Sequence, residues 1–134
     1  MAKISINIAT GTIQKEELIV GIDLGTTNSL VAIIHPDTKE AIALKDIDNT
    51  TLVPSIIHFG SSNETITVGN PAKEFLESDP ANTIYSVKRL MGKSYNDIKS
   101  NADSLSYKII DDNTERLVKV QVGNTFYSPI ELSS

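Results

Sequence analysis

The chain has 134 residues, of which 40% are hydrophobic and 22% charged, and this is the length and composition of one globular domain or of a piece of a larger one. Its formal net charge of −5 argues against a nucleic-acid-binding protein, because such proteins need a clustered basic surface. The absence of cysteine excludes disulfides, thiolate metal sites and cysteine nucleophiles, and it fits a cytoplasmic location. The longest apolar stretches are far shorter than the roughly 20 residues that span a bilayer, so no membrane segment is expected.

The N-terminal residues form an extension ahead of the domain. Residues 3–8 alternate apolar and polar side chains, which predicts a short edge strand. Residues 9–17 are predicted to be a polar connection, and the start of the chain lacks the apolar core and cleavage site of a signal peptide. We therefore interpret residues 1–17 as an N-terminal extension.

A β-meander is predicted for residues 18–47. Residues 18–24 and 29–35 are short apolar runs rich in β-branched side chains, which favours paired strands that are apolar on both faces, and residues 40–44 are predicted to form a third strand. Each apolar face needs a covering layer, and no helices suited to that task are found in the sequence. The chain is therefore expected to be an incomplete domain that can self-associate through its uncovered sheet.

Residues 48–127 mix short strands and short helices. Strands are predicted at residues 55–59, 65–68, 107–110, 117–122 and 125–127, and helical segments at residues 71–77, 94–100 and part of 83–91. Asn70 is predicted to cap the first of these helices, with Pro71 in its first position.

A helix is predicted to begin in residues 128–134. Ser128 is placed to cap it, Pro129 occupies the first position and Glu131 the third, which is the pattern of a capping box.

The turn between the first two apolar strands carries the strongest chemical signal in the sequence. Gly25 permits close approach of a ligand to the backbone, and Thr26, Thr27 and Asn28 supply N–H groups and side-chain donors in one short turn. Such turns bind anions, above all phosphate. Taken alone, the pattern is equally compatible with an ordinary hairpin turn.

Asp23 is the candidate metal-binding residue. It lies at the end of a strand that is expected to be buried, with no lysine or arginine close to it in sequence. A buried carboxylate is costly unless it is paired or lies near a cation. Beside a phosphate, Asp23 would suit Mg²⁺, bound through water.

The string from Ile22 to Ser29, Ile-Asp-Leu-Gly-Thr-Thr-Asn-Ser, resembles the first phosphate-binding signature of the DnaK-type heat-shock chaperone family, within the actin-like ATPase superfamily. It lacks the Gly-Lys-Ser/Thr of a Walker loop. The resemblance extends over residues 18–134 and includes the segments 51–58, 68–73 and 82–92. It implies an α/β fragment of an actin-like (ribonuclease H-like) ATPase domain that uses ATP or ADP with Mg²⁺. Residues 18–47 would belong to lobe I, and residues 48–127 would form an inserted small α+β subdomain.

Lys88 aligns with the catalytic lysine of this family. An ammonium group can offset the negative charge that develops during phosphoryl transfer. Without the resemblance, Lys88 would be interpreted as a solvated helix lysine. Arg89 is interpreted as a structural ion-pair partner, and His35 and His58 as packing residues.

The N-terminal extension, residues 28–31 and residues 86–94 resemble the HscA branch, which serves iron–sulfur cluster assembly. This resemblance implies three kinds of partner: a J-domain co-chaperone, a nucleotide-exchange factor in some branches, and an unfolded or iron–sulfur scaffold client protein. It also assigns the second phosphate loop and the adenosine pocket to sequence beyond residue 134, so the chain alone is expected to have negligible ATPase activity. A fragment of a sugar- or acetate-kinase-like phosphotransferase and a non-catalytic interaction module are the alternatives.

Overall fold

The structure is a computed structural model that describes residues 4–7, 12–15, 18–61, 65–102, 104–111 and 117–134. Residues 1–3, 8–11 and 16–17 lie outside the described residues. They include both ends of the strand predicted at residues 3–8 and parts of the connection predicted at residues 9–17.

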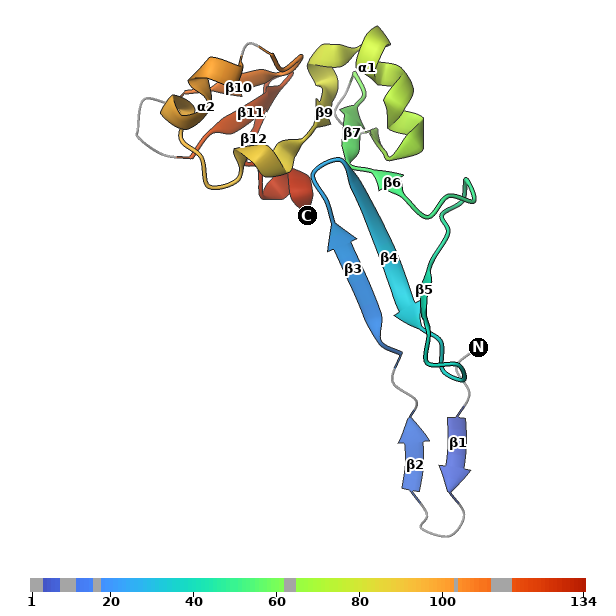
Figure 1. Cartoon of the computed structure of the whole chain (residues 1–134). Helices are drawn as coiled ribbons and strands as arrows, with labels where there is room; N and C mark the ends of the chain where they lie inside the picture. Colours follow the sequence, from blue (N-terminus) through green and yellow to red (C-terminus); the bar gives the residue numbers. More distant parts are fainter. Residues whose placement is uncertain (1–3, 8–11, 16–17, 62–64, 103, 112–116) are drawn as a thin grey trace.

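Four groups of antiparallel strands make up most of the described chain (Figure 1). The strands are β1 (Ile4–Asn7), β2 (Thr12–Lys15), β3 (Val20–Leu24), β4 (Asn28–Ile34), β5 (Ala41–Ala43), β6 (Val53–Pro54), β7 (Ile56–Phe59), β8 (Ile66–Val68), β9 (Thr83–Tyr85), β10 (Lys108–Ile110), β11 (Lys119–Val122) and β12 (Thr125–Tyr127). The α-helices are α1 (Phe75–Ser78) and α2 (Tyr95–Ala102), and the 3₁₀ helices are η1 (Asn70–Glu74), η2 (Pro80–Asn82), η3 (Val87–Leu90) and η4 (Glu131–Ser133). None of the helices in the described ranges is long and apolar enough to cross a bilayer.

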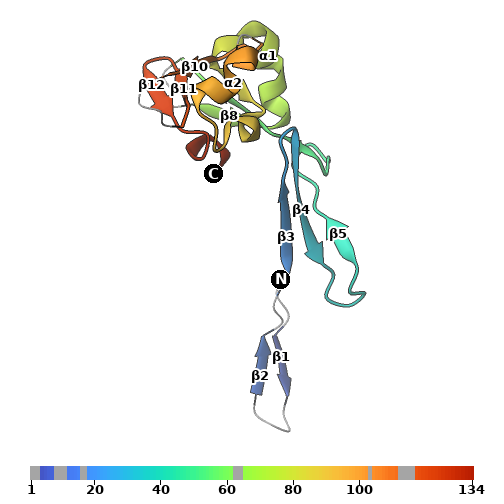
Figure 2. The same cartoon turned by 60° about the vertical axis from the view of Figure 1, so that its left-hand side comes forward.

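The β3–β4 hairpin projects from a compact part that contains β7 to β12 and both α-helices (Figures 1 and 2). Strand β4 lies between β3 and β5, and its first residues also pair with β6. The tip of the hairpin meets the compact part, while its other end points away from it (Figure 1). The predicted β-meander is therefore present, and its turn is the part that reaches the rest of the chain.

The faces of this sheet are largely exposed, although the sequence favours strands buried on both sides. All residues of β3 are exposed, and the side chain of Ile22 keeps 70% of its accessible surface. The other exposed large apolar residues of this region are Leu18, Ile19, Val20, Leu24, Val31, Ile42 and Leu44. Within the described residues, no layer covers these side chains. This agrees with the expectation that the sequence contains no helices suited to cover the sheet.

The hydrophobic core lies in the compact part. Val118, Val120 and Val122, on or beside β11, are almost fully buried together with Ile84 of β9. Tyr107 joins this core, and its hydroxyl group donates a hydrogen bond of 2.7 Å to the carbonyl oxygen of Tyr85. The two three-stranded sheets, β8–β7–β9 and β10–β11–β12, thus share one core.

The prediction that residues 83–91 are helical in part is confirmed by η3, while residues 83–85 form β9 because they pair with β7 in the register Ile57 to Ile84. Two other local predictions are wrong. Residues 12–15, predicted as part of a connection, form β2 and pair with β1. Asn70 does not cap the following helix: Gly69 holds that position, and the amide group of Asn70 instead donates to the Thr50 hydroxyl at 3.2 Å.

The reciprocal hydrogen bonds of the predicted capping box are present at Ser128, although η4 begins at Glu131 and has Ile130, not Ser128, in its N-cap position. The backbone N–H of Glu131 donates to the Ser128 hydroxyl oxygen at 3.2 Å, and the Glu131 carboxylate accepts the backbone N–H of Ser128 at 2.7 Å. These bonds to Ser128 hold the pKa of Glu131 below its ordinary value. The helix predicted at residues 94–100 is also present, as α2.

Candidate phosphate-binding site

The turn that joins β3 to β4 is tight enough to require glycine at position 25. A Cβ atom on Gly25 would lie 2.1 Å from the carbonyl oxygen of Asn28, which is closer than real Cβ atoms come to another atom. The requirement arises from this close backbone approach. Gly25 therefore shapes the turn, as the sequence predicts.

Ser55, between β6 and β7, ties the turn to the compact part. Its backbone N–H donates to the carbonyl oxygen of Thr27 at 2.8 Å, and its hydroxyl donates to the carbonyl oxygen of Gly25 at 2.9 Å. The hydroxyl oxygens of Ser29 and Ser55 are 3.0 Å apart. The shape of the turn thus depends on a residue that is 30 positions from Gly25 in the sequence.

The turn offers donors that suit an anion. Thr26 is half-buried, whereas Thr27 and Asn28 are exposed. Among the described residues, none accepts a hydrogen bond from the backbone N–H of Thr26 or of Thr27. Free N–H groups beside hydroxyl and amide side chains form the kind of concave donor set that binds phosphate oxygens. We define residues 25–28 as the phosphate loop.

Lys88 lies beside the phosphate loop. The 3₁₀ helix η3 buries Val87 and Leu90, which recur at its period of three residues, and leaves Lys88 and Arg89 exposed. The Lys88 Nζ atom donates a hydrogen bond to the carbonyl oxygen of Leu24, the residue before the loop. Two groups that the sequence separates by 64 positions are therefore in contact.

A cavity of about 330 Å³ adjoins this contact. Leu24, Gly25 and Thr26 line it from the hairpin, and Val87 and Lys88 line it from η3. Its lining is mainly apolar, and Lys88 is the one residue among those lining it that has a charged side chain. Positive charge and free N–H donors thus meet next to a recess, which is an arrangement suited to a bound phosphate group.

Asp23 differs from its prediction in one respect: it is exposed, so burial does not force it to find a cation. It stands in β3 two residues before Gly25 and pairs across the hairpin with Leu30. No described cation forms an ion pair with its carboxylate. An accessible carboxylate fits contact with a hydrated Mg²⁺ better than direct enclosure of the ion. No group of three or more potential metal ligands is found among the described residues.

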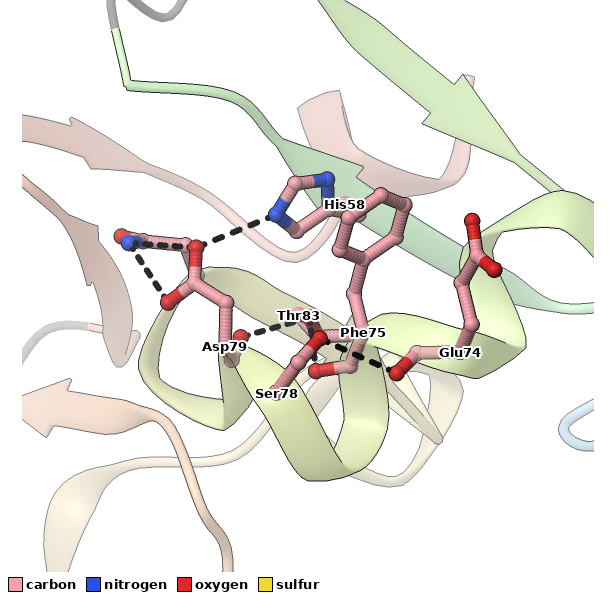
Figure 3. Close-up of polar contacts among 7 residues, drawn as sticks. His58, Glu74, Phe75, Ser78, Asp79 and Thr83 are labelled. Carbon is pink, nitrogen blue, oxygen red and sulfur yellow. Dashed lines mark hydrogen bonds and ion pairs between the residues drawn. The ribbon is translucent and has the colours of Figure 1, made fainter.

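His58 belongs to a separate cluster in the compact part (Figure 3). His58 is 6% exposed, and its ring stacks on that of Phe75, with the ring centroids 3.7 Å apart and the planes at 5°. The Nε2 atom of His58 lies 3.1 Å from a carboxylate oxygen of Asp79, which also accepts bonds from the Asn82 amide group. The interpretation of His58 as a packing residue agrees with this geometry.

His35 and Arg89 are the other two basic residues that the sequence singles out. His35 accepts hydrogen bonds at its Nδ1 atom from the backbone N–H groups of Asp37 and Thr38, at 3.2 and 3.3 Å, and so stabilises a turn. Arg89 is exposed and forms no ion pair with another described residue, and its role as an ion-pair partner stays a prediction.

Ser29 and Ser55 are the site residues that sequence reasoning missed. Neither has a side chain that stands out chemically, and Ser55 reaches the loop only through the pairing of β6 with β4. The one available signal was the position of Ser55 inside the segment 51–58, which carries part of the family resemblance.

A tight turn with free N–H groups and a lysine beside it is the kind of site that suits a phosphate group, and comparison with known proteins identifies the family. The profile described as Hsp70 protein matches residues 19–134, so the chain belongs to the Hsp70 family. The family implies an actin-like ATPase fold, and the mixture of sheets and helices seen here is consistent with that α/β class.

The similar proteins include several chaperones of the HscA type. The chain is 44% identical over 120 residues to a "Chaperone protein HscA homolog" of Mannheimia succiniciproducens, which covers 90% of this chain and 19% of that protein. It is 47% identical over 94 residues to the homolog of Photobacterium profundum, covering 70% of this chain and 15% of that protein. It is 42% identical over 121 residues to "Chaperone protein HscA" of Proteus mirabilis, covering 90% and 19%.

The chain spans at most about a fifth of the length of these relatives. Within the family, it is an HscA-type N-terminal nucleotide-binding segment. The matches do not favour the sugar- or acetate-kinase alternative or a non-catalytic interaction module.

Proposed function

We propose that the chain supplies the first phosphate loop and the catalytic lysine of an ATP-dependent chaperone, which hydrolyses ATP to control client binding. The observation that carries this proposal is the hydrogen bond from Lys88 Nζ to the carbonyl oxygen of Leu24, directly before the phosphate loop. It puts a cation where the charge of a bound phosphate would otherwise be uncompensated. The relatives named HscA support the same function.

Each candidate residue has a distinct role in this proposal. Thr26, Thr27 and Asn28 bind phosphate oxygens, and Gly25 lets the ligand approach the backbone. Lys88 offsets negative charge on the terminal phosphate group and helps to orient the attacking water, since phosphoryl transfer depends on positioning and electrostatics. Asp23 holds water molecules of a hydrated Mg²⁺, and that ion, when bound, neutralises phosphate charge.

The division of the chain follows from these roles. Residues 1–17 form an extension, residues 18–47 the lobe I β-meander with the phosphate loop, and residues 48–127 an inserted small subdomain that carries Lys88. Residues 128–134 begin the helix that returns to lobe I. In support, Lys88 reaches the loop from the compact part, whereas Asp23 and the phosphate loop belong to the hairpin.

We assign the chaperone to iron–sulfur cluster assembly in the cytoplasm. Its partners would be a J-domain co-chaperone, in some branches a nucleotide-exchange factor, and an unfolded or iron–sulfur scaffold client. The identity of 41% to 47% with HscA-named proteins supports this assignment over a general chaperone role.

The test is a calorimetric titration of Mg·ADP into this chain and into the full-length Proteus mirabilis protein, with and without replacement of the matching lysine. Weak binding is expected for the chain and tight binding for the full-length protein. Lys88→Ala should weaken binding to the chain by about tenfold, because a charge-assisted bond to phosphate is worth about 1.5–3 kcal/mol.

Lys99→Ala is the matched control, since Lys99 is an exposed lysine on α2. Equal affinity of wild type and Lys88→Ala would contradict the role of Lys88. ATP turnover by the chain alone, at the rate of the full-length protein, would contradict the expectation that the site needs further sequence.

A further inference from the structure

Ser55 contacts the phosphate loop through both its backbone and its side chain. The N–H group reaches the carbonyl oxygen of Thr27, and the hydroxyl group reaches that of Gly25. A single residue thus holds two carbonyl groups of a four-residue loop. It does so from the point where the chain passes from β6 into β7.

The direction of the hydrogen bonds around Ser55 can be assigned. A hydroxyl group has one proton to donate, and that of Ser55 is given to the carbonyl oxygen of Gly25. The contact of 3.0 Å between the two hydroxyl oxygens therefore has Ser29 as its donor. The result is a half-buried chain of bonds from Ser29 through Ser55 to Gly25, in which each bond polarises the next.

Hydrogen bonding matters here because packing leaves the loop much free space. Two cavities border it, of about 380 and 330 Å³, and both are lined by Thr26 and Ser55. Side-chain contacts on those sides of the loop are correspondingly sparse. The bonds to Ser55 must then contribute a large part of the order of the loop.

The bonds to Ser55 also determine where the loop's donors point. In a trans peptide unit the carbonyl group and the following N–H group lie on opposite sides. Drawing the carbonyl oxygen of Gly25 toward Ser55 therefore turns the N–H group of Thr26 away from Ser55. The bond to the carbonyl of Thr27 turns the N–H group of Asn28 away in the same manner.

We propose that Ser55 is the positioning residue of the phosphate loop, which directs the free N–H group of Thr26 toward a bound phosphate without touching the ligand. This rests on the proposed function of the loop. The geometry of the loop at residues 25–28 therefore depends on Ser55, which lies directly before β7 and about 30 positions later in the sequence.

The test measures loop order and ligand affinity separately, in the 134-residue chain labelled with ¹⁵N. Ser55→Ala removes the hydroxyl bond, and Ser55→Thr retains it. Ser78→Ala removes a hydroxyl bond of the same kind, from Ser78 of α1 to the carbonyl oxygen of Glu74, the last residue of η1. Loop order without ligand is read from hydrogen exchange of the amide at position 55 and from ¹⁵N relaxation of Thr26. Affinity is read by titration with Mg·ADP and with inorganic pyrophosphate.

Ser55→Ala should speed amide exchange and weaken binding of either probe by about fivefold each, the equivalent of one lost hydrogen bond of about 1 kcal/mol. Ser55→Thr should bring both the exchange rate and the affinity to within about twofold of wild type, because it keeps the hydroxyl bond. Ser78→Ala should change neither.

Unchanged exchange and relaxation in Ser55→Ala would overturn the proposal. If the wild-type chain binds neither probe but Ser55→Ala still loosens the loop, then the positioning role stands and phosphate binding by this chain is refuted. If Ser55→Ala unfolds the core, judged by the Ile84 and Val120 amide signals, Ser29→Ala decides. Ser29→Ala removes the bond that the Ser29 hydroxyl donates to Ser55 but keeps the bond from Ser55 to Gly25. If the loop in Ser29→Ala is as rigid as in wild type, the bonds from Ser29 through Ser55 do not order the loop and the proposal is overturned.

Discussion

At the scale of single residues, the phosphate loop is determined by backbone crowding and by a few polar contacts. Gly25 is confined by the carbonyl oxygen of Asn28, and its own carbonyl oxygen accepts the bond from Ser55. Lys88 supplies the neighbouring cation through its contact with Leu24. The small size of residue 25 and the hydroxyl of residue 55 therefore act on the same peptide group.

Gly25→Ala should open the β3–β4 hairpin, because the added methyl group cannot be placed 2.1 Å from the carbonyl oxygen of Asn28. A substitution that the native backbone does not accommodate costs more than about 1 kcal/mol. Hydrogen exchange of the hairpin amides should accelerate by about fivefold or more, as measured by NMR.

Gly21→Ala is the control in the same strand. Its Cβ atom would meet only the carbonyl oxygen of Ala32, at 4.0 Å, so exchange should stay the same or slow slightly. Equal effects of the two substitutions would show that the close approach at Gly25 is not what requires glycine there.

At the scale of elements, α1 and the start of β9 are held to β7 by the cluster around His58. Thr83 donates its hydroxyl proton in the direction of two carbonyl oxygens, those of Phe75 and Asp79, at 3.1 and 2.7 Å. The Asp79 carboxylate lies against the His58 ring (Figure 3). Because His58 is in the middle strand of its sheet, this cluster joins the helical corner to the strands that bear the core.

Asp79 should give this corner a dependence on pH. The hydrogen bonds from His58 and then Asn82 hold the pKa of Asp79 below its ordinary value of 3.8. The carboxylate therefore stabilises the fold above about pH 4, and this contribution is lost as the pH falls through the lowered pKa. Thermal unfolding followed between pH 7 and pH 2 should show a loss of stability at the acid end that is smaller in Asp79→Asn.

Asp97 and Glu131 also have lowered pKa values, so the wild-type curve contains their contributions as well. The difference between wild type and Asp79→Asn isolates that of Asp79. Asp37→Asn, which changes an exposed turn residue, controls for the loss of one negative charge. Parallel curves for wild type and Asp79→Asn would exclude a role for Asp79 in acid stability.

Which elements could be predicted from the sequence depended on the range of the interactions that form them. The turn at residues 25–28 and the reciprocal hydrogen bonds between Ser128 and Glu131 depend on residues close together in the sequence. Both are found at the predicted positions. Thr83–Tyr85 is a strand only because it pairs with β7, more than 20 residues earlier, and no local pattern encodes that partner. The role of the Ser55 hydroxyl was missed because the loop that it bonds lies 30 positions earlier in the sequence.

At the scale of the whole molecule, the chain combines a well-packed part with an exposed sheet. Apolar side chains of β3, β4 and β5 remain accessible, while the core of the compact part is closed around Val120 and Ile84. Exposed apolar surface of this kind favours association, and the outer edge of β3 has no partner strand among the described residues.

The chain should therefore self-associate as its concentration rises, through the sheet of β3, β4 and β5. Ile22→Lys should shift association to concentrations at least about tenfold higher, since it removes an exposed apolar group and adds a charge. Sedimentation velocity over a range of concentrations measures this.

Ile47→Lys is the matched control, because Ile47 is 98% exposed but lies outside the strands. A compact monomer at all concentrations, or equal effects of the two substitutions, would rule out association through this sheet.

The buried hydroxyl of Tyr107 makes part of the chain optically distinctive. The sequence contains four tyrosines and no tryptophan, so its near-ultraviolet absorbance and fluorescence come essentially from tyrosine. Burial raises the pKa of Tyr107, and its phenol is bonded to the carbonyl of Tyr85 at the centre of the compact part. Neutral Tyr107 thus belongs to the folded core, and the appearance of its phenolate band in alkali would signal that the core has opened. The chain therefore carries an intrinsic chromophore that distinguishes events in the compact part from events in the hairpin, where no tyrosine is found.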